Sequence, residues 1–462
     1  MVVYKLIHHN YFLVTALVAF GILSQSERPI RLQKMPYDST FVRSIAGNYR
    51  IDSDRVISMG PMDEAEGWLS FFDSKTRRGG ILYALTDSTL FTGPTFGVDS
   101  PMTIQAKIIR GNKNEISGLL WQEPGQPSQD AIRLKDFRQE EISFNNGSVR
   151  LAGNLTLPNT TGPHPAVILI HGAGTIVPTR DFGYWSVYFA GHGIAVLAFD
   201  KRGGGASGGN AFTASYKDLA DDVIAGLTML QNRPDIDPGR IGLYGTSNGG
   251  YIAPLVAVRS NHRVAFITVR SGSALNVGNN IDYEVGNDLR SEGFAETDIK
   301  RAVSIRHQVT DFVIGHPTIT QANWDSLVLE VNKVSGERWF PWARVAWVPR
   351  ISPSDSFGSG FIAKLRAEWQ YDPIPYWRQV RCPVYVMLGE HDRSVSSSET
   401  ASLLRKTLAA NSQATIRIFP NGNHGLLESK TGFNSEMKSL AYYVPDFQSS
   451  LISWIQRVTR QK

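Results

Sequence analysis

The sequence predicts a doubly wound α/β domain with a mostly parallel sheet, preceded by a small all-β domain and interrupted by a helical, aromatic-rich segment. Three observations support this fold class. Short extended runs broken by turn residues fill residues 35–136. From residue 137 onward, nearly continuous apolar runs alternate with helical patterns, as expected for buried parallel strands joined by helices. Over about residues 274–376 the strong strand signals stop and aromatic residues accumulate.

Length, charge and cysteine content limit the classes of protein to consider. A chain of 462 residues exceeds what one domain usually occupies, so two domains plus an insertion are expected. The net charge of +5 is spread along the chain without a long Lys/Arg run, so we expect no nucleic-acid partner. The single cysteine, Cys382, excludes an intramolecular disulfide and leaves the redox compartment undecided.

Residues 1–26 have the pattern of a signal peptide. Lys5 precedes an apolar run from Tyr11 to Leu23, and small residues follow it at Ser24-Gln25-Ser26. The run is shorter than the roughly 20 residues needed to cross a bilayer. We therefore expect export to the periplasm or the extracellular space, without stable membrane insertion after signal removal. An uncleaved anchor and a buried N-terminal helix are the alternatives.

The predicted β domain contains several runs of strand length. We expect it to be a packing or gating module for the domain that follows, because its residues assemble no catalytic set; a binding role is the alternative. The five clearest runs are Asn48–Ile51, Trp68–Phe72, Gly80–Leu85, Met102–Ile109 and Glu115–Trp121.

The α/β domain, over residues 137–462, begins with two entry strands. Glu141–Phe144 and Val149–Leu157 are joined across Asn146-Gly147, a dipeptide suited to a type I′ hairpin turn. The buried strands that we expect next are Ala166–Ile170, Ile194–Phe199, Ile241–Tyr244, Ala265–Val269 and Val384–Leu388. The clearest helices are Tyr216–Gln231, a segment starting at Asn248, Ser397–Ala409 and Asp446–Arg460.

The strongest chemical signal is Gly245-Thr246-Ser247-Asn248-Gly249, which lies directly after a predicted strand and directly before a helical pattern. This is G-x-S-x-G in a strand–turn–helix context. A sharp turn crowds the backbone around the serine, so small residues are needed two positions before and after it. Because the turn lifts the hydroxyl above the sheet, we predict that Ser247 is a nucleophile.

A serine hydroxyl needs a base to accept its proton, and the base needs a carboxylate to orient it. His424 follows the predicted strand Ile416–Phe419, and Asp392 follows Val384–Leu388. The chain order Ser, Asp, His is the one that accompanies a serine elbow of this kind. We predict His424 as the base and Asp392 as the acid, with Glu390, two residues earlier, as the alternative carboxylate.

Two backbone N–H groups are predicted to bind the oxyanion that forms when the serine attacks a carbonyl. The N–H of Asn248 lies at the start of the helix after the elbow. The second donor is predicted from the Gly-rich loop that follows Ile170, with Ala173 preferred and Gly174 as the alternative.

The remaining histidines receive lesser roles. We expect His171 to brace the oxyanion loop and His391 to be a surface or supporting residue. No partner spacing is evident for the other histidines that we weighed, to which we assign no role: His164, His192, His262, His307 and His316.

A second glycine motif competes with this interpretation. Gly203–Gly208 formally matches the dinucleotide pattern G-x-G-x-x-G, with Asp222 further along. However, Asp200-Lys201-Arg202 separate the strand from the glycines, no helix opens at the third glycine, and Asp222 lies inside a helical pattern. We therefore expect no cofactor. No paired Cys or His at metal-binding spacing occurs, so we also expect no metal.

The segment at about 274–376 is too long for a structureless loop and is predicted to be a helical cap over the active site. Thr297–Thr310 is its clearest helix. For most of its aromatic residues, the favoured interpretation is that they form the core of the cap itself. They are Trp324, Trp339, Phe340, Trp342, Trp347, Trp369, Tyr371, Tyr376 and Trp377.

From about Glu141 onward the sequence resembles bacterial α/β-hydrolase esterases related to the serine aminopeptidase and dienelactone hydrolase branches. Thr246 departs from this group, which more often has His at that position. The resemblance implies a Ser/Asp/His triad and hydrolysis of a small-molecule carboxylic ester. The motifs that carry it are His171-Gly-Ala-Gly, Phe199-Asp-Lys-Arg-Gly-Gly-Gly-Ala-Ser, Gly245-Thr-Ser-Asn-Gly-Gly, Gly389-Glu-His-Asp and Gly422-Asn-His-Gly.

Esterase activity is therefore the leading prediction. A serine peptidase of the aminopeptidase type and a non-catalytic binding protein on a hydrolase scaffold are the alternatives. An intact serine, base and acid argue against the binding protein, because binding alone does not need all three. The sequence does not indicate the acyl length, the alcohol or the oligomeric state.

Overall fold

The computed structural model describes residues 39–62, 68–173 and 179–460. The predicted signal peptide lies outside these residues. Of the described residues, 276–371 and 433–437 form one compact unit, and the others form a second, larger unit. Among the helices of the described part, none is both long enough and apolar enough to cross a membrane.

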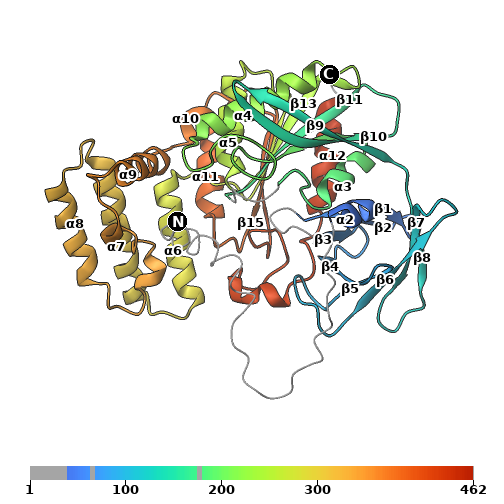
Figure 1. The fold of residues 1–462 in the computed structure, drawn as a ribbon, viewed down its shortest axis with the longest axis horizontal. Coiled ribbons are helices and arrows are strands. Elements are labelled where there is room, and N and C mark those ends of the chain that lie inside the picture. Colours follow the sequence, from blue (N-terminus) through green and yellow to red (C-terminus); the bar gives the residue numbers. More distant parts are fainter. Residues whose placement is uncertain (1–38, 63–67, 174–178, 461–462) are drawn as a thin grey trace. The chain divides into compact units, whose positions relative to one another are not determined.

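The first part of the larger unit is a closed barrel of eight antiparallel strands, drawn from blue to teal in Figure 1. Each strand pairs with the next, and β1 also pairs with β8, so that Tyr49 lies opposite Arg133. The strands are β1 (Gly47–Arg50), β2 (Val56–Pro61), β3 (Leu69–Asp73), β4 (Gly79–Thr86), β5 (Thr89–Thr92), β6 (Ile104–Arg110), β7 (Ile116–Gln122) and β8 (Gln129–Arg133).

Apolar side chains fill the barrel. The rings of Phe71 and Trp121 meet edge to face with centroids 5.8 Å apart, and a short helix, α2 (Ser39–Ile45), adds Val42 and Ile45 to the same core. A packed interior of this kind stabilises a small domain through burial of apolar area. This module is the small all-β domain that the sequence predicts.

The second sheet has eight strands in the order β16-β15-β14-β13-β11-β12-β10-β9. The strands from β11 to β16 run parallel, whereas β10 runs antiparallel to both β9 and β12. The predicted α/β-hydrolase fold class is therefore confirmed. The strands are β9 (Phe137–Asn146), β10 (Val149–Pro158), β11 (His164–Ile170), β12 (Ala195–Phe199), β13 (Ile236–Thr246), β14 (Ile267–Arg270), β15 (Val384–Gly389) and β16 (Ala414–Phe419).

The hairpin between β9 and β10 differs in one detail from the prediction. Asn146 pairs with Val149, so the two loop residues are Gly147 and Ser148, one position later than expected. Gly147 supplies a positive φ of 56°, which glycine adopts without a steric penalty.

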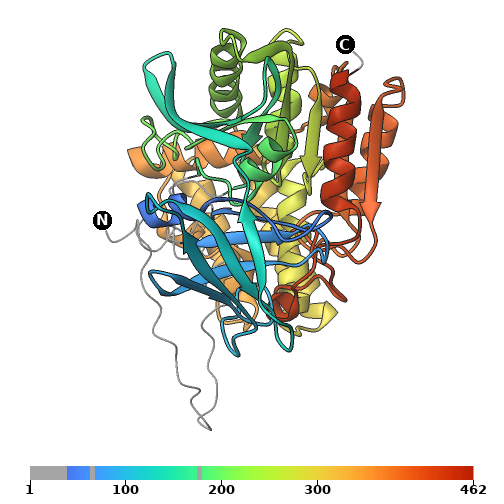
Figure 2. The same ribbon diagram turned by 90° about the vertical axis from the view of Figure 1, so that its right-hand side faces the viewer.

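Helices cover the two faces of the sheet. On one face, α3 and α12 meet where the rings of Trp185 and Phe447 lie 5.6 Å apart, and Trp454 of α12 stacks on Tyr385 of β15. Figure 2 shows α12, in red, beside the orange-red strand β16. On the other face α4 packs against α5, and α10 lies between α5 and α11. The helices are α3 (Trp185–Gly191), α4 (Tyr216–Gln231), α5 (Gly249–Arg259), α10 (Ile374–Trp377), α11 (Ser397–Thr407) and α12 (Phe447–Arg460).

The barrel is packed against the α/β sheet domain within the same compact unit. The ring of Phe72 in the barrel stacks on Tyr184 and meets Tyr443 edge to face, with centroids 5.4 and 5.7 Å away. The backbone N–H of Gly79 donates to the carbonyl of Ala441 over 2.8 Å. The barrel therefore contacts two segments of the α/β sheet domain that are far apart in the sequence.

The smaller unit is helical. The guanidinium of Arg306 lies 4.1 Å from the ring centre of Trp369, and the indole N–H of Trp324 donates to the carbonyl of Ile351 over 2.8 Å. Several of its tryptophans thus pack within the unit itself, while its predicted role as a cap stays a prediction. Its elements are α6 (Val277–Ser291), α7 (Glu296–Gly315), α8 (Gln321–Lys333), η2 (Phe340–Ala343), η3 (Val348–Arg350) and α9 (Ser356–Trp369); η4 (Asn434–Ser439) lies where the chain returns to the larger unit.

Candidate active site

Ser247 lies in the sharp turn between β13 and α5. Its φ of 50° falls in the left-handed region, which a residue with a side chain adopts only under constraint from its surroundings. A Cβ at Gly245 would lie 2.7 Å from the carbonyl oxygen of Gly249, and a Cβ at Gly249 would crowd the backbone of Ile170. The two glycines of the motif are therefore needed for the turn to close.

Asp392 and His424 are brought together by the loops after β15 and β16. The Nδ1 atom of His424 lies 2.9 and 3.0 Å from the two carboxylate oxygens of Asp392. A Cβ at Gly389 would overlap the backbone of Gly422, so the two loops pack closely enough to require glycine there. The hydrogen bond leaves Nε2 of His424 as the nitrogen that can exchange a proton with a nucleophile.

Hydrogen bonds from backbone N–H groups hold the two loops that carry this pair. The carboxylate of Asp392 is buried and accepts hydrogen bonds from the N–H groups of Ser394 and Val395, at 2.9 and 2.8 Å. The side chain of Asn423, next to His424, accepts from the N–H of Leu427 at 2.9 Å. Both loops are thus held independently of the His424–Asp392 bond.

The two neighbours of Asp392 take other roles. The carboxylate of Glu390 is exposed and accepts the N–H of Asn421 at 3.0 Å, and His391 bonds through Nδ1 to the carbonyl of Ser429 at 2.9 Å. The geometry therefore favours Asp392 over Glu390 as the partner of His424.

The predicted oxyanion donors lie on two elements beside Ser247. Asn248 is the N-cap of α5, and its side-chain oxygen accepts the hydroxyl of Tyr216 at 2.8 Å. A Cβ at Gly172 would lie 3.5 Å from the Cβ of Ser247, so the loop after β11 passes close to the predicted nucleophile. Ala173, the next residue, is exposed. The alternative donor, Gly174, lies outside the described residues.

Residues 167–434, more than half of the chain, match the alpha/beta hydrolase family. The chain belongs to this family. The match includes the serine elbow and both loops of the histidine–carboxylate pair.

Named relatives of this protein include esterases. It is 26% identical to the esterase EstD of Thermotoga maritima over 166 residues, which cover 34% of this chain and 39% of EstD. It is 30% identical to the esterase FrsA of Vibrio cholerae over 136 residues, 29% of this chain and 32% of FrsA. The chain thus matches between about a third and two fifths of the length of these two relatives.

Solved structures of esterases superpose on part of this chain. An esterase of Pyrococcus furiosus is 16% identical, with a TM-score of 0.42, and the superposition covers 70% of this chain and 91% of the esterase. Acetyl xylan esterase 1 of Thermoanaerobacterium is also 16% identical, with a TM-score of 0.41 and coverage of 71% and 85%.

The competing glycine motif forms a turn in this protein. The N–H of Gly203 donates to the carbonyl of Gly208 over 2.8 Å, which closes the glycine-rich segment on itself. Asp222 is buried inside α4 and accepts a hydrogen bond of 2.6 Å from Nε of Arg202. The acidic residue of the motif is thus engaged by the arginine that precedes the glycines.

His171 is buried and packs against Phe182 with ring centroids 4.3 Å apart. Both residues belong to the connection between β11 and α3. In the same connection, burial raises the pKa of Asp181 above its usual value, while Arg43 at 3.4 Å opposes that shift. Arg43 comes from α2, which ties the barrel to this connection.

Sequence reasoning missed two buried charges directly after β12. Asp200 is fully buried and Lys201 is nearly so. Sequence reasoning used them for the family resemblance and against the dinucleotide motif, and assigned neither residue a role. The signal that could have found them is the placement of two charged residues immediately after an apolar strand, where burial of a charge requires a partner.

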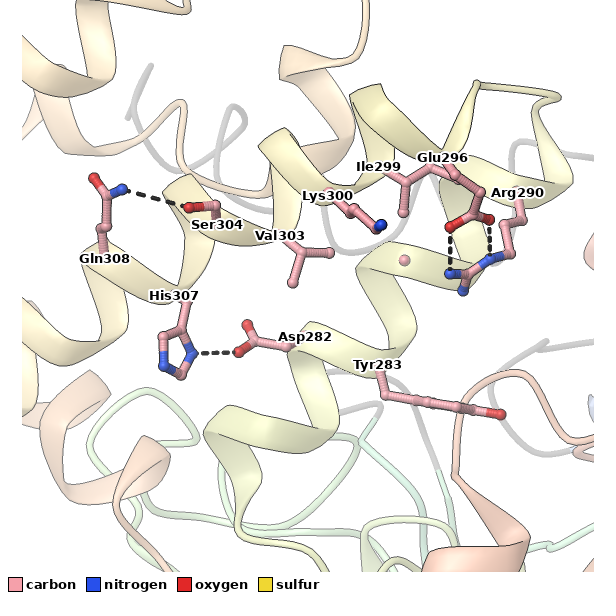
Figure 3. Close-up of a pocket in the computed structure, with 11 residues that line it drawn as sticks. Asp282, Tyr283, Arg290, Glu296, Ile299, Lys300, Val303, Ser304, His307 and Gln308 are labelled. Atoms are coloured by element: carbon pink, nitrogen blue, oxygen red, sulfur yellow. Dashed lines mark hydrogen bonds and ion pairs between the residues drawn. The ribbon is translucent and has the colours of Figure 1, made fainter.

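Sequence reasoning found no partner spacing for His307, but the structure gives this histidine two carboxylate partners. In the helical unit its Nδ1 lies 2.8 Å from Asp282 of α6 (Figure 3). Its Nε2 lies 3.4 Å from Asp311, four residues along α7. The hydrogen bond to Asp282 raises the pKa of His307, and burial raises the pKa of Asp282. The i to i+4 spacing from His307 to Asp311 was visible in the sequence.

Proposed function

We propose that this protein hydrolyses carboxylic esters through an acyl-enzyme on Ser247. The observation that carries the proposal is the buried carboxylate of Asp392, which holds His424 in one orientation in the same compact unit as a strained serine elbow. The esterases among its relatives support ester hydrolysis as the reaction.

In the first half of the reaction, Nε2 of His424 accepts the hydroxyl proton of Ser247 as Oγ attacks the ester carbonyl carbon. The carbonyl oxygen becomes negative and is stabilised by the N–H groups of Asn248 and Ala173. His424 then gives the proton to the alcohol oxygen, the C–O bond breaks, and the acyl group stays on Ser247.

In the second half, His424 accepts a proton from a water molecule that attacks the acyl carbon. The tetrahedral intermediate collapses with the proton returned to Oγ of Ser247, and the carboxylic acid leaves. Asp392 remains ionised and keeps the imidazole in the required tautomer throughout.

The aromatic-rich helical unit is proposed to act as the cap that sets acyl preference by apolar burial. Each methylene buried on binding contributes about 0.8 kcal/mol, so kcat/KM is expected to rise roughly fourfold per added carbon until the pocket is full. The acyl length at the maximum then measures the depth of the pocket.

The proposal is tested on one preparation with a fluorophosphonate probe and a substrate panel. The probe should label wild-type protein and leave Ser247→Ala unlabelled. The panel compares p-nitrophenyl acetate, butyrate, octanoate and palmitate with Ala-, Leu- and Pro-p-nitroanilides. Higher kcat/KM on an anilide than on every ester identifies a peptidase instead, and failure of the probe to label wild type identifies a non-catalytic scaffold.

A further inference from the structure

Two adjacent buried charges after β12, Asp200 and Lys201, have no part in the reaction steps above. The exposed fractions of the two residues are 0% and 7%. A buried charge is costly unless hydrogen bonds compensate for the lost water. The partners of these residues therefore indicate what the two charges do.

The ammonium of Lys201 donates a hydrogen bond to the carbonyl oxygen of Gly172. That carbonyl and the N–H of Ala173 belong to the same peptide unit, which is planar and trans, so they point in opposite directions. Holding the oxygen toward Lys201 therefore fixes the direction of the Ala173 N–H. The positive charge of the Lys201 ammonium beside the carbonyl oxygen also polarises the peptide and makes its N–H a stronger donor.

This peptide unit lies beside the proposed nucleophile. A Cβ at Gly172 would be 3.5 Å from the Cβ of Ser247, in ordinary van der Waals contact. Gly172 therefore lies close to the serine, and a preorganised oxyanion site requires an N–H of fixed direction in this neighbourhood.

Asp200 holds the far side of the same connection. Its Oδ1 accepts the N–H groups of Thr179 and Arg180, at 2.7 and 3.0 Å, and its Oδ2 accepts the N–H of Ala206 at 2.9 Å. The two consecutive residues thus contact the connection between β11 and α3 at two places, Lys201 next to the serine and Asp200 further along.

We infer that Lys201 is a positioning residue of the oxyanion site, which orients the Gly172–Ala173 peptide through the Gly172 carbonyl. The inference rests on the proposed function, because it requires an oxyanion on the carbonyl attacked by Ser247. Lys201 does not itself touch the substrate.

The experiment compares Lys201→Met, which removes the donor, with Lys201→Arg, which keeps a cationic donor, and with Lys217→Met as a matched control. Lys217 is exposed on α4. Losing one oxyanion donor lowers kcat by about 10²- to 10³-fold, and we expect Lys201→Met to approach that loss with KM changed by less than about twofold. Lys201→Arg should recover a large part of kcat, and Lys217→Met should match wild type.

A second readout separates positioning from simple structural support. A trifluoromethyl ketone forms a hemiketal oxyanion on the serine, so its Ki should rise in Lys201→Met by the same factor by which kcat/KM falls. A purely structural lysine would lower Tm while leaving kcat and this Ki unchanged in the folded fraction, and that result overturns the inference.

If Lys201→Met does not fold, Lys201→Gln decides the matter with a neutral donor. We expect kcat between those of wild type and a donor-loss variant, and a wild-type kcat in Lys201→Gln together with a wild-type Ki overturns the inference. Failure of the proposed function looks different, because it is seen in wild-type protein: the protein would then either not react with the fluorophosphonate or cleave an anilide with higher kcat/KM than every ester.

Discussion

Two histidine–carboxylate pairs in this protein can be compared, Asp392–His424 on strand-end loops and Asp282–His307 between two helices. The shortest distances are nearly the same, 2.9 and 2.8 Å. The side chain of Asp392 is fully buried and is also held by backbone N–H groups, whereas that of Asp282 is 14% exposed. The two histidine side chains, His424 and His307, are 35% and 51% exposed.

The difference shows that a short distance does not by itself identify a catalytic pair. His424 is held by a carboxylate that cannot turn away, on a loop at the same sheet edge as the serine elbow. His307 is paired on an open helix surface, where the gain from an ion pair is small. Preorganisation of the carboxylate distinguishes the two pairs.

The largest expected effect comes from removing the proposed nucleophile or base. Ser247→Ala and His424→Ala should each lower kcat on p-nitrophenyl butyrate by about 10⁴- to 10⁶-fold, since members of a triad act as a unit. His307→Ala, the matched change in the other pair, should leave kcat within about twofold of wild type, because it contacts no reacting group. Most activity surviving in Ser247→Ala would contradict the assignment.

The orienting carboxylate should have the next largest effect. Asp392→Asn keeps the shape of the side chain but favours the wrong histidine tautomer, so kcat should fall by about 10³- to 10⁴-fold. Glu390→Gln serves as the control, with an expected loss below about tenfold, because Glu390 only accepts a backbone N–H. The opposite ranking of the two variants would assign the acid role to Glu390.

A third comparison uses the pH dependence of activity. The base must be neutral to accept the serine proton, so kcat/KM should rise with pH through an apparent pKa of about 6 to 7.5 and then level off. The His307→Gln variant should give the same profile as wild type. A flat profile between about pH 5 and 9 is incompatible with a histidine base.

The smallest effect concerns stability. Because Asp282 raises the pKa of His307, the pair stabilises the folded protein most when the imidazole is protonated. That contribution is complete below the ordinary histidine pKa of about 6.5 and is lost as the pH rises through the higher folded-state value. The difference in Tm between wild type and His307→Gln should therefore be larger at about pH 6 than at about pH 9. Equal differences at both pH values would show that the pair does not contribute through its charge.

The sequence was sufficient to predict those helices and strands that a local residue pattern determines. The helix predicted over Tyr216–Gln231 has those bounds in the structure, and five of the barrel strands were expected. The barrel strands that were missed are short or lack apolar alternation: β2 includes Gly60 and Pro61, β5 has four residues, and β8 carries Gln129, Asp130 and Arg133. Barrel closure depends on pairing between β1 and β8, which no local pattern encodes.

The candidate site likewise has parts that a local sequence pattern predicts and parts that depend on contacts between distant loops. The serine elbow was predictable because its glycines, strand and helix are adjacent in sequence. The choice between Asp392 and Glu390 stayed open, because only the folded loop shows which carboxylate faces His424 and which faces Asn421. The bond from Lys201 to Gly172 joins two loops that are 29 residues apart, so the motif was visible while its contact was not.

The packing of the barrel on the C-terminal segment has a consequence for biosynthesis. The N–H of Gly79 bonds to the carbonyl of Ala441, and Arg77 donates to the carbonyl of Tyr443 over 2.7 Å. Ribosomes add about 5 to 20 residues per second, so the 362 residues that follow Gly79, up to and including Ala441, take roughly 20 to 70 s to synthesise. During that interval the nascent barrel has Gly79 without its partner Ala441 and Phe72 without the ring of Tyr443.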